Sequence, residues 1–291
     1  MPENQRLFRI GGEMEKDSGA CVRKNRIELK HGMHSGVAAE SNTLLNRLRE
    51  ILSSISKDLN GLPVISVIMP AFNEEQAVGS VIRRTEEVLR MLVEKYELIV
   101  IDDGSTDKTV QHASQNGAIV ISNARNLGKG CTLRRGFQQA RGHIIVTMDT
   151  DGANNPEEIP KLLYPILEGN GVDVVLGSRF IGYIEDNAIP RLNILGNTII
   201  NLVLSFILGH RITDSQSGFR AYKRTVVKNL TIDSQGFEVE TEMICRLFKT
   251  NLGVKEVPIT CNGRNGTLSK LNPFKDGLKI LTTIFRYTLA Y

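Results

Sequence analysis

Residues 143–158 read HIIVTMDTDGANNPEE, and this stretch decides the class of fold. An apolar run is followed at once by Asp149-Thr150-Asp151, and Pro156 then favours the first turn of a helix. A strand, an acidic turn and a helix in that order are typical of one unit of a parallel sheet. Because little chain separates the turn from the helix, we expect the Asp149 and Asp151 carboxylates to face the same ligand.

The same alternation of apolar runs and helical periodicity continues on both sides of this stretch. Val- and Ile-rich runs predict strands at Val64–Met69, Glu97–Ile101, Ala118–Ser122, His143–Met148 and Val172–Gly177. Apolar residues at helical spacing predict helices near Glu75–Glu94, Thr106–Gln115, Gly130–Arg141 and Pro156–Glu168. The pattern indicates an α/β, Rossmann-like, mostly parallel sheet with helices on both faces.

Polar residues follow three of the predicted strands. They are Asn73-Glu74, Asp102-Asp103-Gly104-Ser105 and Asp149-Thr150-Asp151. Ligands of such sheets bind at the carboxyl ends of the strands, so we expect these groups to share one pocket. Carboxylate oxygens suit Mg²⁺ or Mn²⁺, which would also hold a diphosphate, and Asp149 and Asp151 are the candidate metal ligands. Carboxylates that only cap the following helix are the alternative.

Composition and charge exclude some functions and favour others. The 291 residues are 41% hydrophobic and 23% charged, enough for a sizeable core, and a net charge of +4 is too small to indicate nucleic acid. Residues 262–291 carry five cations and one anion, so anionic partners are expected there. The four cysteines lie far apart, which favours reduced thiols, and the first residues lack the apolar core of a secretory signal.

The two ends of the chain differ from its centre. Residues 1–60 are predicted to form an extension, with a mobile arm up to Glu40 and an amphipathic helix between Ser41 and Gly61. That helix could dock on the domain, dimerise or lie on a membrane. Residues 61–271 are predicted to form the main domain, and residues 272–291 a basic amphipathic helix.

A further helix is predicted at Leu192–Leu208, where polar residues repeat every four positions. They are Asn193, Asn197, Asn201 and Ser205. One narrow polar stripe on an apolar helix favours a place at a membrane interface or over a binding site, whereas a membrane-spanning helix would not need it. No run of about 20 uninterrupted apolar residues occurs, so we expect no membrane-spanning helix.

Together, Pro70-Ala71-Phe72-Asn73-Glu74, residues 102–107 and Asp149-Thr150-Asp151 resemble family 2 glycosyltransferases with the GT-A fold. Among these the chain is most similar to the polyprenyl-phosphate (dolichol-phosphate) sugar synthases, from about Pro63 to Leu271. The resemblance implies that Pro70, Phe72 and Glu74 line the base and ribose site and that Asp102 contacts the base. It implies that residues 149–151 hold the metal and the diphosphate. Ala153 stands where many relatives carry glutamine.

The resemblance also implies an acceptor site and a donor clamp. Arg179 and Arg191 match arginines near the acceptor phosphate, and Asp214 and Ser217 lie in the segment that borders this site. Glu240 belongs to a Gly-Phe-Glu-x-Glu segment below the acceptor pocket. Arg264 and Lys270 match a loop whose cations hold the donor diphosphate, a task that suits arginine. Asp214 and Arg179, with the two metal ligands, are the candidate catalytic residues.

The resemblance implies an inverting glycosyltransferase that uses a nucleotide diphosphate sugar, UDP favoured over GDP, and a polyprenyl or dolichyl phosphate. The expected place is the cytoplasmic face of a membrane, peripheral or anchored by further chain. One alternative is a sugar or protein hydroxyl acceptor, with Asp214 or Glu240 as general base. Another is a non-catalytic member that only binds nucleotide sugar or membrane. A nucleotidyltransferase usually carries a Gly-rich, Arg-containing loop after its first strand, unlike residues 70–74.

Overall fold

The computed structural model describes residues 43–264, 270 and 273–289. From Leu44 onward these residues belong to one compact unit. The predicted N-terminal arm and the predicted N-cap at Ser41 lie outside the described residues, as do residues 265–269 of the loop between Arg264 and Lys270. The division of the chain at residues 60 and 271 stays a prediction.

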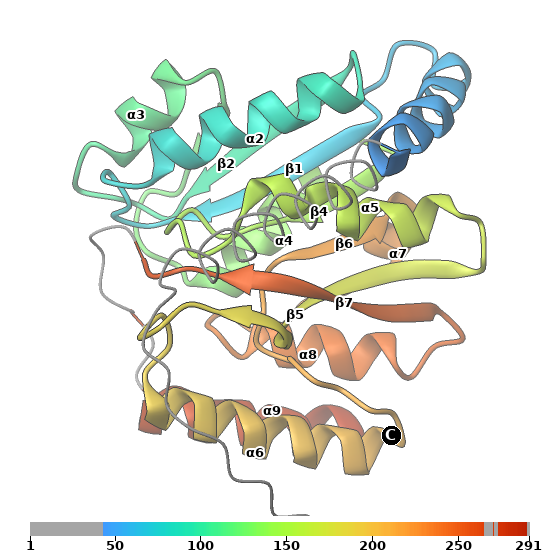
Figure 1. Ribbon diagram of the computed structural model, residues 1–291. Helices are drawn as coiled ribbons and strands as arrows, with labels where there is room; N and C mark the ends of the chain where they lie inside the picture. Colours follow the sequence, from blue (N-terminus) through green and yellow to red (C-terminus); the bar gives the residue numbers. More distant parts are fainter. Residues whose placement is uncertain (1–42, 265–269, 271–272, 290–291) are drawn as a thin grey trace, which may run out of the picture. The chain divides into compact units, whose positions relative to one another are not determined.

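One sheet forms the centre of the unit, and its strands run in the order β3-β2-β1-β4-β6-β5-β7 (Figure 1). The strands are β1 (Ile65–Ala71), β2 (Tyr96–Asp102), β3 (Ile119–Ser122), β4 (Ile144–Thr147), β5 (Val172–Ile184), β6 (Arg220–Lys223) and β7 (Gly253–Cys261). Strand β6 is antiparallel to both of its neighbours, and the other pairs are parallel. The predicted α/β class with a mostly parallel sheet is confirmed.

Helices connect and cover these strands. They are a helix over residues 43–58, α2 (Val78–Leu92), α3 (Thr109–Gln115), α4 (Lys129–Gln139), the short 3₁₀ helix η1 (Pro156–Glu158), α5 (Ile159–Leu167), α6 (Arg191–Leu208), α7 (Arg224–Asn229), α8 (Val239–Leu247) and α9 (Pro273–Leu289). The predicted elements all occur, with shifted ends. Strand β5 continues past the predicted end at Gly177, and four elements were not predicted: β6, α7, α8 and β7.

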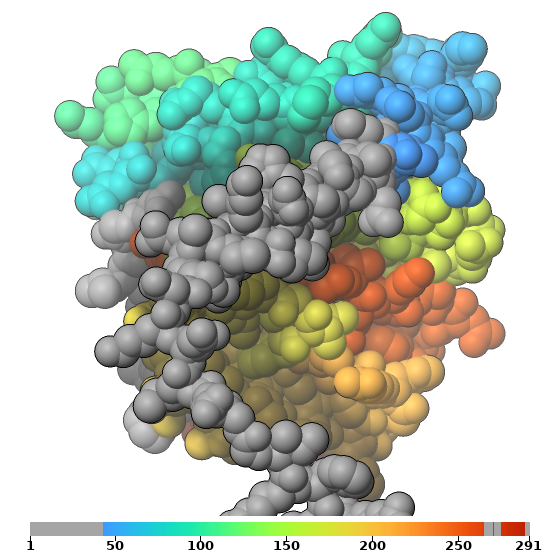
Figure 2. Space-filling model, in the orientation of Figure 1, coloured from blue at the N-terminus to red at the C-terminus, as the bar shows by residue number. Residues whose placement is uncertain are grey.

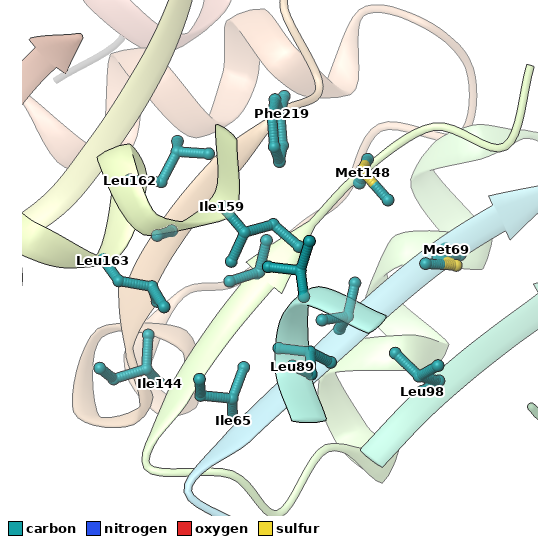
Figure 3. Close-up of a cluster of buried hydrophobic side chains, with 14 of the residues drawn as sticks. Ile65, Met69, Leu89, Leu98, Ile144, Met148, Ile159, Leu162, Leu163 and Phe219 are labelled. Atoms are coloured by element: carbon teal, nitrogen blue, oxygen red, sulfur yellow. The ribbon is translucent and has the colours of Figure 1, made fainter. Parts of the chain in front are cut away.

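Two hydrophobic cores lie on the two faces of the sheet, because successive strand residues point to opposite sides. Ile65, Val67 and Met69 of β1 share the first core with residues of α2, α5 and the helix over residues 43–58. Figure 3 shows Ile65 and Met69 together with Leu89 of α2 and Leu163 of α5. Ile68 faces the second core, to which α4, α6, α8 and α9 contribute. In Figure 2 the first part of the chain, blue to green, lies at the top, and the yellow to orange part lies below it.

The helix over residues 43–58 docks on the domain, which was one of three possibilities left open by its sequence. Leu48 and Leu52 are completely buried in the first core. Arg47 donates a 3.0 Å hydrogen bond to the Tyr164 hydroxyl on α5. Burial of each large aliphatic side chain contributes roughly 1.5–3 kcal/mol, which is sufficient to fix the helix there.

Helices α6 and α9 pack side by side below the β5–β7 part of the sheet (Figure 1). By length and composition alone, α6 could cross a bilayer, since its mean hydropathy is 1.5. The sequence criterion of about 20 uninterrupted apolar residues does not detect it, because polar residues interrupt the helix. Five of its large apolar side chains are exposed: Leu192, Leu195, Ile199, Leu202 and Phe206. They recur every three or four residues and therefore form one stripe along the helix.

Candidate functional site

The loops after β1 and β2 are joined by hydrogen bonds at the carboxyl edge of the sheet. The Asn73 amide nitrogen donates to Ser105 Oγ at 2.8 Å, and the Thr106 amide nitrogen donates back to Asn73 Oδ1 at 2.8 Å. Asn73 has a φ of +51°, in the left-handed region where asparagine is tolerated better than most residues. The Glu74 amide nitrogen donates to Thr109 Oγ1 at 2.7 Å. These bonds fix the two loops that carry the predicted base and ribose residues.

Glu74 and Phe72 share a cation. Lys270 Nζ lies 2.7 Å from Glu74 Oε1 and 5.3 Å from the centre of the Phe72 ring, and it also donates to the Phe72 carbonyl oxygen. Lys270 is thus drawn to the end of β1 from a segment almost 200 residues further along the chain. The structure therefore brings together two groups of predicted donor residues that the sequence places far apart.

Two neighbouring aspartates at the end of β2 have different roles. Asp102 is buried and accepts a hydrogen bond from the Ser105 amide nitrogen at 3.1 Å, inside its own turn. Asp103 accepts from Asn123 Nδ2 and from the amide nitrogens of Leu127 and Gly128, all within 2.9 Å. Asp103 thereby organises the loop that leads to Lys129, the first residue of α4.

The turn after β4 is fixed on one side by Thr150, whose hydroxyl donates to the Pro70 carbonyl oxygen at 2.9 Å. Its two carboxylates face cations from different parts of the chain. Lys129 Nζ lies 2.7 Å from Asp149 Oδ1, and Arg264 Nε lies 3.1 Å from Asp151 Oδ2. Asp151 and Arg264, which the sequence assigns separately to the metal and to the donor diphosphate, thus pair with each other, and Lys129 is an additional cation at this turn.

Lys129 also contacts Glu240 Oε1 at 2.7 Å, so one ammonium group joins Asp149 to Glu240. Burial alone would raise the pKa of Asp149, but Lys129, then Arg264 and Arg179, outweigh it, and the pKa lies below its ordinary value. Burial alone would lower the pKa of Lys129, but Asp149 and Glu240 raise it above its ordinary value. Lys129 and Asp149 are therefore both charged near neutral pH.

A sequence signal for Lys129 exists in the segment Asn126-Leu127-Gly128-Lys129-Gly130. Gly128 has a φ of +94°, and a Cβ atom at Gly130 would collide with the backbone at Ser234. The Gly130 amide nitrogen donates to the Gln235 carbonyl oxygen at 2.7 Å. Glycines on both sides of a lysine thus allow α4 to begin directly against the segment before α8, which delivers Lys129 to Glu240.

A small pocket lies beneath Asp149, between α4 and α8. Lys129, Asp149, Arg220, Tyr222 and Glu240 supply its polar lining. Glu240 Oε2 and the Tyr222 hydroxyl are buried without a hydrogen-bond partner among the described residues. Such groups are satisfied when a ligand or water enters the pocket.

Arg179 and Asp214, both predicted to lie near the acceptor, form a two-pronged ion pair. Arg179 Nε lies 2.7 Å from Asp214 Oδ2, Nη2 lies 2.8 Å from Oδ1, and the Arg179 amide nitrogen donates to Oδ2 at 3.0 Å. The Asp214 side chain is completely buried. Burial alone would lower the pKa of Arg179, but Asp214 keeps it above its ordinary value. Because its oxygens accept three hydrogen bonds, Asp214 is poorly placed to take a proton from an acceptor.

Two further predicted acceptor residues lie apart from that pair. Arg191 is exposed at the start of α6, and its side chain makes no hydrogen bond or ion pair with the described residues. Ser217 is buried, and its hydroxyl accepts a long 3.4 Å hydrogen bond from the Phe219 amide nitrogen. Among the described residues, Glu240 is thus joined to Asp149 through Lys129, and Arg179 and Asp214 pair with each other, whereas Arg191 makes no such contact.

The residues next to the acidic turn tie it to β7. The Asn262 amide nitrogen donates to the Ala153 carbonyl oxygen at 2.9 Å, and Asn262 Nδ2 donates to Asn155 Oδ1 at 2.6 Å. Asn155 Oδ1 also accepts from Arg84 on α2. These bonds explain how Arg264, two residues after Asn262, reaches Asp151.

The described residues contain no group of three His, Cys, Asp or Glu side chains that could hold a metal ion alone. Two carboxylates are nevertheless suitable for Mg²⁺ or Mn²⁺ when a diphosphate and water supply the remaining oxygens, as is usual for Mg²⁺. The arrangement thus fits a cation bound together with its nucleotide ligand.

Solved structures define the class of protein as a glycosyltransferase of the GT-A fold. The chain is similar to glucosyl-3-phosphoglycerate synthase from Mycobacterium tuberculosis in complex with Mn²⁺, UDP-glucose and phosphoglyceric acid, with a TM-score of 0.66 and 27% identity over 84% of this chain and 83% of that chain. The same enzyme crystallised with Mg²⁺ and UDP gives a TM-score of 0.65 and 26% identity over 84% of this chain and 83% of that one.

Residues 66–231 match the model of glycosyl transferase family 2, and the chain belongs to this family. It is 33% identical to the uncharacterized protein MJ1222 of Methanocaldococcus jannaschii, over 82% of this chain and 96% of that protein. It is 34% identical to the low-salt glycan biosynthesis hexosyltransferase Agl6 of Haloferax volcanii, over 78% of this chain and 54% of that protein. An undecaprenyl-phosphate 4-deoxy-4-formamido-L-arabinose transferase of Pseudomonas fluorescens is 32% identical over 56% of this chain and 48% of that protein. The chain thus spans about half the length of the last two.

Proposed function

We propose that this glycosyltransferase moves a sugar, with inversion, from a nucleoside diphosphate, UDP favoured over GDP, to a polyprenyl or dolichyl phosphate at the cytoplasmic face of a membrane. The observation that carries the proposal is the position of α6. Its outer stripe is apolar and exposed. Its inner side forms hydrogen bonds to the segment that contains Asp214, the partner of Arg179. A lipid acceptor needs its phosphate next to a surface that meets the bilayer.

The donor would bind across the ends of β1, β2 and β4. Pro70, Phe72, Glu74 and Asp102 would hold the base and ribose, and Thr150 keeps the acidic turn against Pro70. Asp149 and Asp151 would hold Mg²⁺ or Mn²⁺, which when bound would neutralise charge on the departing diphosphate. Arg264 and Lys270, which pair with Asp151 and Glu74, can exchange these carboxylates for diphosphate oxygens.

The acceptor would be an anion. One oxygen of the lipid phosphate forms the new bond to C1 of the sugar as the bond from C1 to the diphosphate breaks, and the nucleoside diphosphate leaves with the electron pair. A phosphate oxygen needs no deprotonation for this step, so no general base is required. Arg179 supplies positive charge, and Arg191 lies at the start of the apolar helix.

Exposed apolar residues and exposed cations support the proposed contact with a membrane surface. No charged residue interrupts α6 after Arg191, and Phe206 on its outer stripe is 89% exposed. On α9, Leu278 and Phe285 are exposed apolar residues, and Lys279 and Arg286 are exposed cations. Apolar side chains with flanking cations favour an anionic leaflet such as the cytoplasmic one.

The test is transfer of radiolabelled sugar from a panel of UDP- and GDP-sugars to polyprenyl phosphates in detergent. We expect label in the organic phase, dependence on Mg²⁺ or Mn²⁺, and an inverted anomeric configuration by NMR. Label that stays in water on a soluble hydroxyl acceptor, with Arg179 dispensable, would contradict the lipid acceptor. Donor binding without turnover on any acceptor would favour a non-catalytic member.

A further inference from the structure

The polar stripe on α6 faces inward, toward the segment after the helix. Asn201 is only 6% exposed, and its Nδ2 donates to the Thr213 carbonyl oxygen at 2.7 Å. Its Oδ1 accepts from the Ser215 amide nitrogen at 2.9 Å and from the Ser215 hydroxyl at 2.7 Å. One turn further on, Ser205 Oγ accepts from the Ile212 amide nitrogen at 2.9 Å. Asn201 and Ser205, the second half of the stripe, therefore bind the backbone of residues 212–215.

These hydrogen bonds enclose Asp214. A single asparagine amide bonds to the carbonyl before Asp214 and to the amide after it. From β7, Glu256 accepts from the amide nitrogens of Thr213 at 3.0 Å and Asp214 at 3.2 Å. The backbone on both sides of Asp214 is thus fixed, and its carboxylate is directed to Arg179.

We infer that Asn201 is a positioning residue for the acceptor reaction, which rests on the proposed function. It ties the outward apolar helix to the Asp214–Arg179 pair, so that Arg179 is held where a lipid phosphate arrives along α6. Only a side chain with both a donor and an acceptor can bridge the carbonyl and the amide. Removing it takes these partners from the Thr213 carbonyl and the buried Ser215 amide, and the segment shifts to satisfy them. A shift of about 1 Å in a positioning group can lower a rate by roughly a hundredfold.

A merely structural role for Asn201 has different consequences. It would lower the melting temperature and affect donor and acceptor use alike. Asn201 acts on Arg179 through the segment at residues 213–215, which carries Asp214. A positioning role therefore affects acceptor use selectively and requires an intact Arg179–Asp214 pair.

The experiment compares Asn201→Ala with Asn197→Ala in the full chain. Asn197 lies one turn earlier in the same stripe, and its side chain makes no hydrogen bond with the described residues. We expect Asn201→Ala to lower kcat/KM for polyprenyl phosphate by about ten- to a hundredfold with an unchanged donor KM. Asn197→Ala should match the wild type.

Two measurements separate positioning from stability. In an Arg179→Lys background, which removes the two-pronged pair, Asn201→Ala should cause little further loss of kcat/KM, since coupled residues are not additive. The positioning role would be overturned if the losses of kcat/KM from Asn201→Ala and Arg179→Lys were fully additive. It would also be overturned if Asn201→Ala lowered kcat/KM no more than Asn197→Ala does. Asn201→Ser, which removes less volume, serves if Asn201→Ala does not fold.

A failure of the proposed function gives a different result. A folded wild-type protein that transfers no sugar to lipid phosphate contradicts that function whatever the variants do. The role of Asn201 is then judged by hydrogen exchange of residues 212–216, which should be faster in Asn201→Ala than in Asn197→Ala. Equal exchange in the two variants would overturn it.

Discussion

The two halves of the sheet handle charge in opposite ways. At the ends of β1 and β4, Glu74 and Asp151 pair with Lys270 and Arg264, side chains that remain about one-third exposed. Beside β5 and β6, Asp214 is completely buried against Arg179, and the outside of α6 is apolar. The half that we propose to bind the donor (the donor half) thus offers charges that can exchange partners. The half that we propose to bind the acceptor (the acceptor half) holds a buried pair behind an apolar surface. This difference suits a charged, soluble donor and a lipid acceptor.

The largest effect should come from the donor half. We expect Asp151→Ala to lower transfer by about a hundredfold or more, because the diphosphate loses a metal ligand, while the fold is kept. The measurements are initial rates and thermal unfolding, with EDTA and added Mn²⁺ as companions. Full activity of the folded variant, or activity unaffected by EDTA, would remove the metal role from Asp151.

On the acceptor side we expect Asp214→Asn to act mainly on stability. A buried carboxylate that loses its charge leaves the Arg179 guanidinium uncompensated, at a cost of about 3–5 kcal/mol in the free energy of unfolding. Urea denaturation measures it, with Arg191→Ala as the control because Arg191 is exposed. Unchanged stability with a large loss of kcat would instead indicate a general base and revive the hydroxyl acceptor.

Arg264→Ala tests whether the donor half really exchanges its partners. One charge-assisted contact to the diphosphate is worth roughly 1.5–3 kcal/mol, so kcat/KM for the donor should fall about ten- to a hundredfold. The free energy of unfolding should change little, since Arg264 is one-third exposed. An unchanged kcat/KM would place this side chain away from the bound donor.

Phe206→Asp tests the apolar surface of the acceptor half. We expect binding to vesicles of anionic phospholipid to weaken about tenfold, because the Phe206 ring no longer enters the bilayer and a charge replaces it. Co-sedimentation measures the effect. Met91→Asp on α2, also an exposed apolar position, is the matched control and should bind as the wild type. Equal vesicle binding by the two variants would show that α6 does not contact the membrane.

The smallest effect concerns pH. The pKa of Asp149 lies below its ordinary value, so its charge is lost only as the pH falls through that lowered pKa. The pKa of Arg179 is raised, so its charge is lost only at very high pH. Transfer to lipid phosphate should therefore change less than about twofold between about pH 7 and 9, above the second ionisation of a phosphate monoester near 6. A rising or falling limb of the pH–rate profile in this range would indicate a general base that titrates.

Much of the donor half could be predicted because its signals are local. Strands of Val and Ile followed by Glu74, Asp102 or Asp149 are visible in short windows, and parallel strands must bring their ends to one edge. The antiparallel β6 and the parallel β7 are not predicted, because their sequences RAYK and GVKEVPITC contain charged residues or proline in place of a continuous Val and Ile run. Lys129 has a local glycine signal, but its role depends on its distant partners Asp149 and Glu240.

The sequence by itself determined the α/β class, the acidic turn at residues 149–151 and the candidate cations Arg264 and Lys270. The class and the acidic turn depend on periodicity and spacing within one segment, and the two cations on the resemblance to family 2 glycosyltransferases. Only the tertiary structure decided that Asp214 is buried as the partner of Arg179 and that the polar stripe of α6 points inward. Burial and the direction of a helix face arise only when distant segments pack together. The sequence of a helix with one polar stripe is therefore compatible with a stripe that faces the protein and with one that faces solvent.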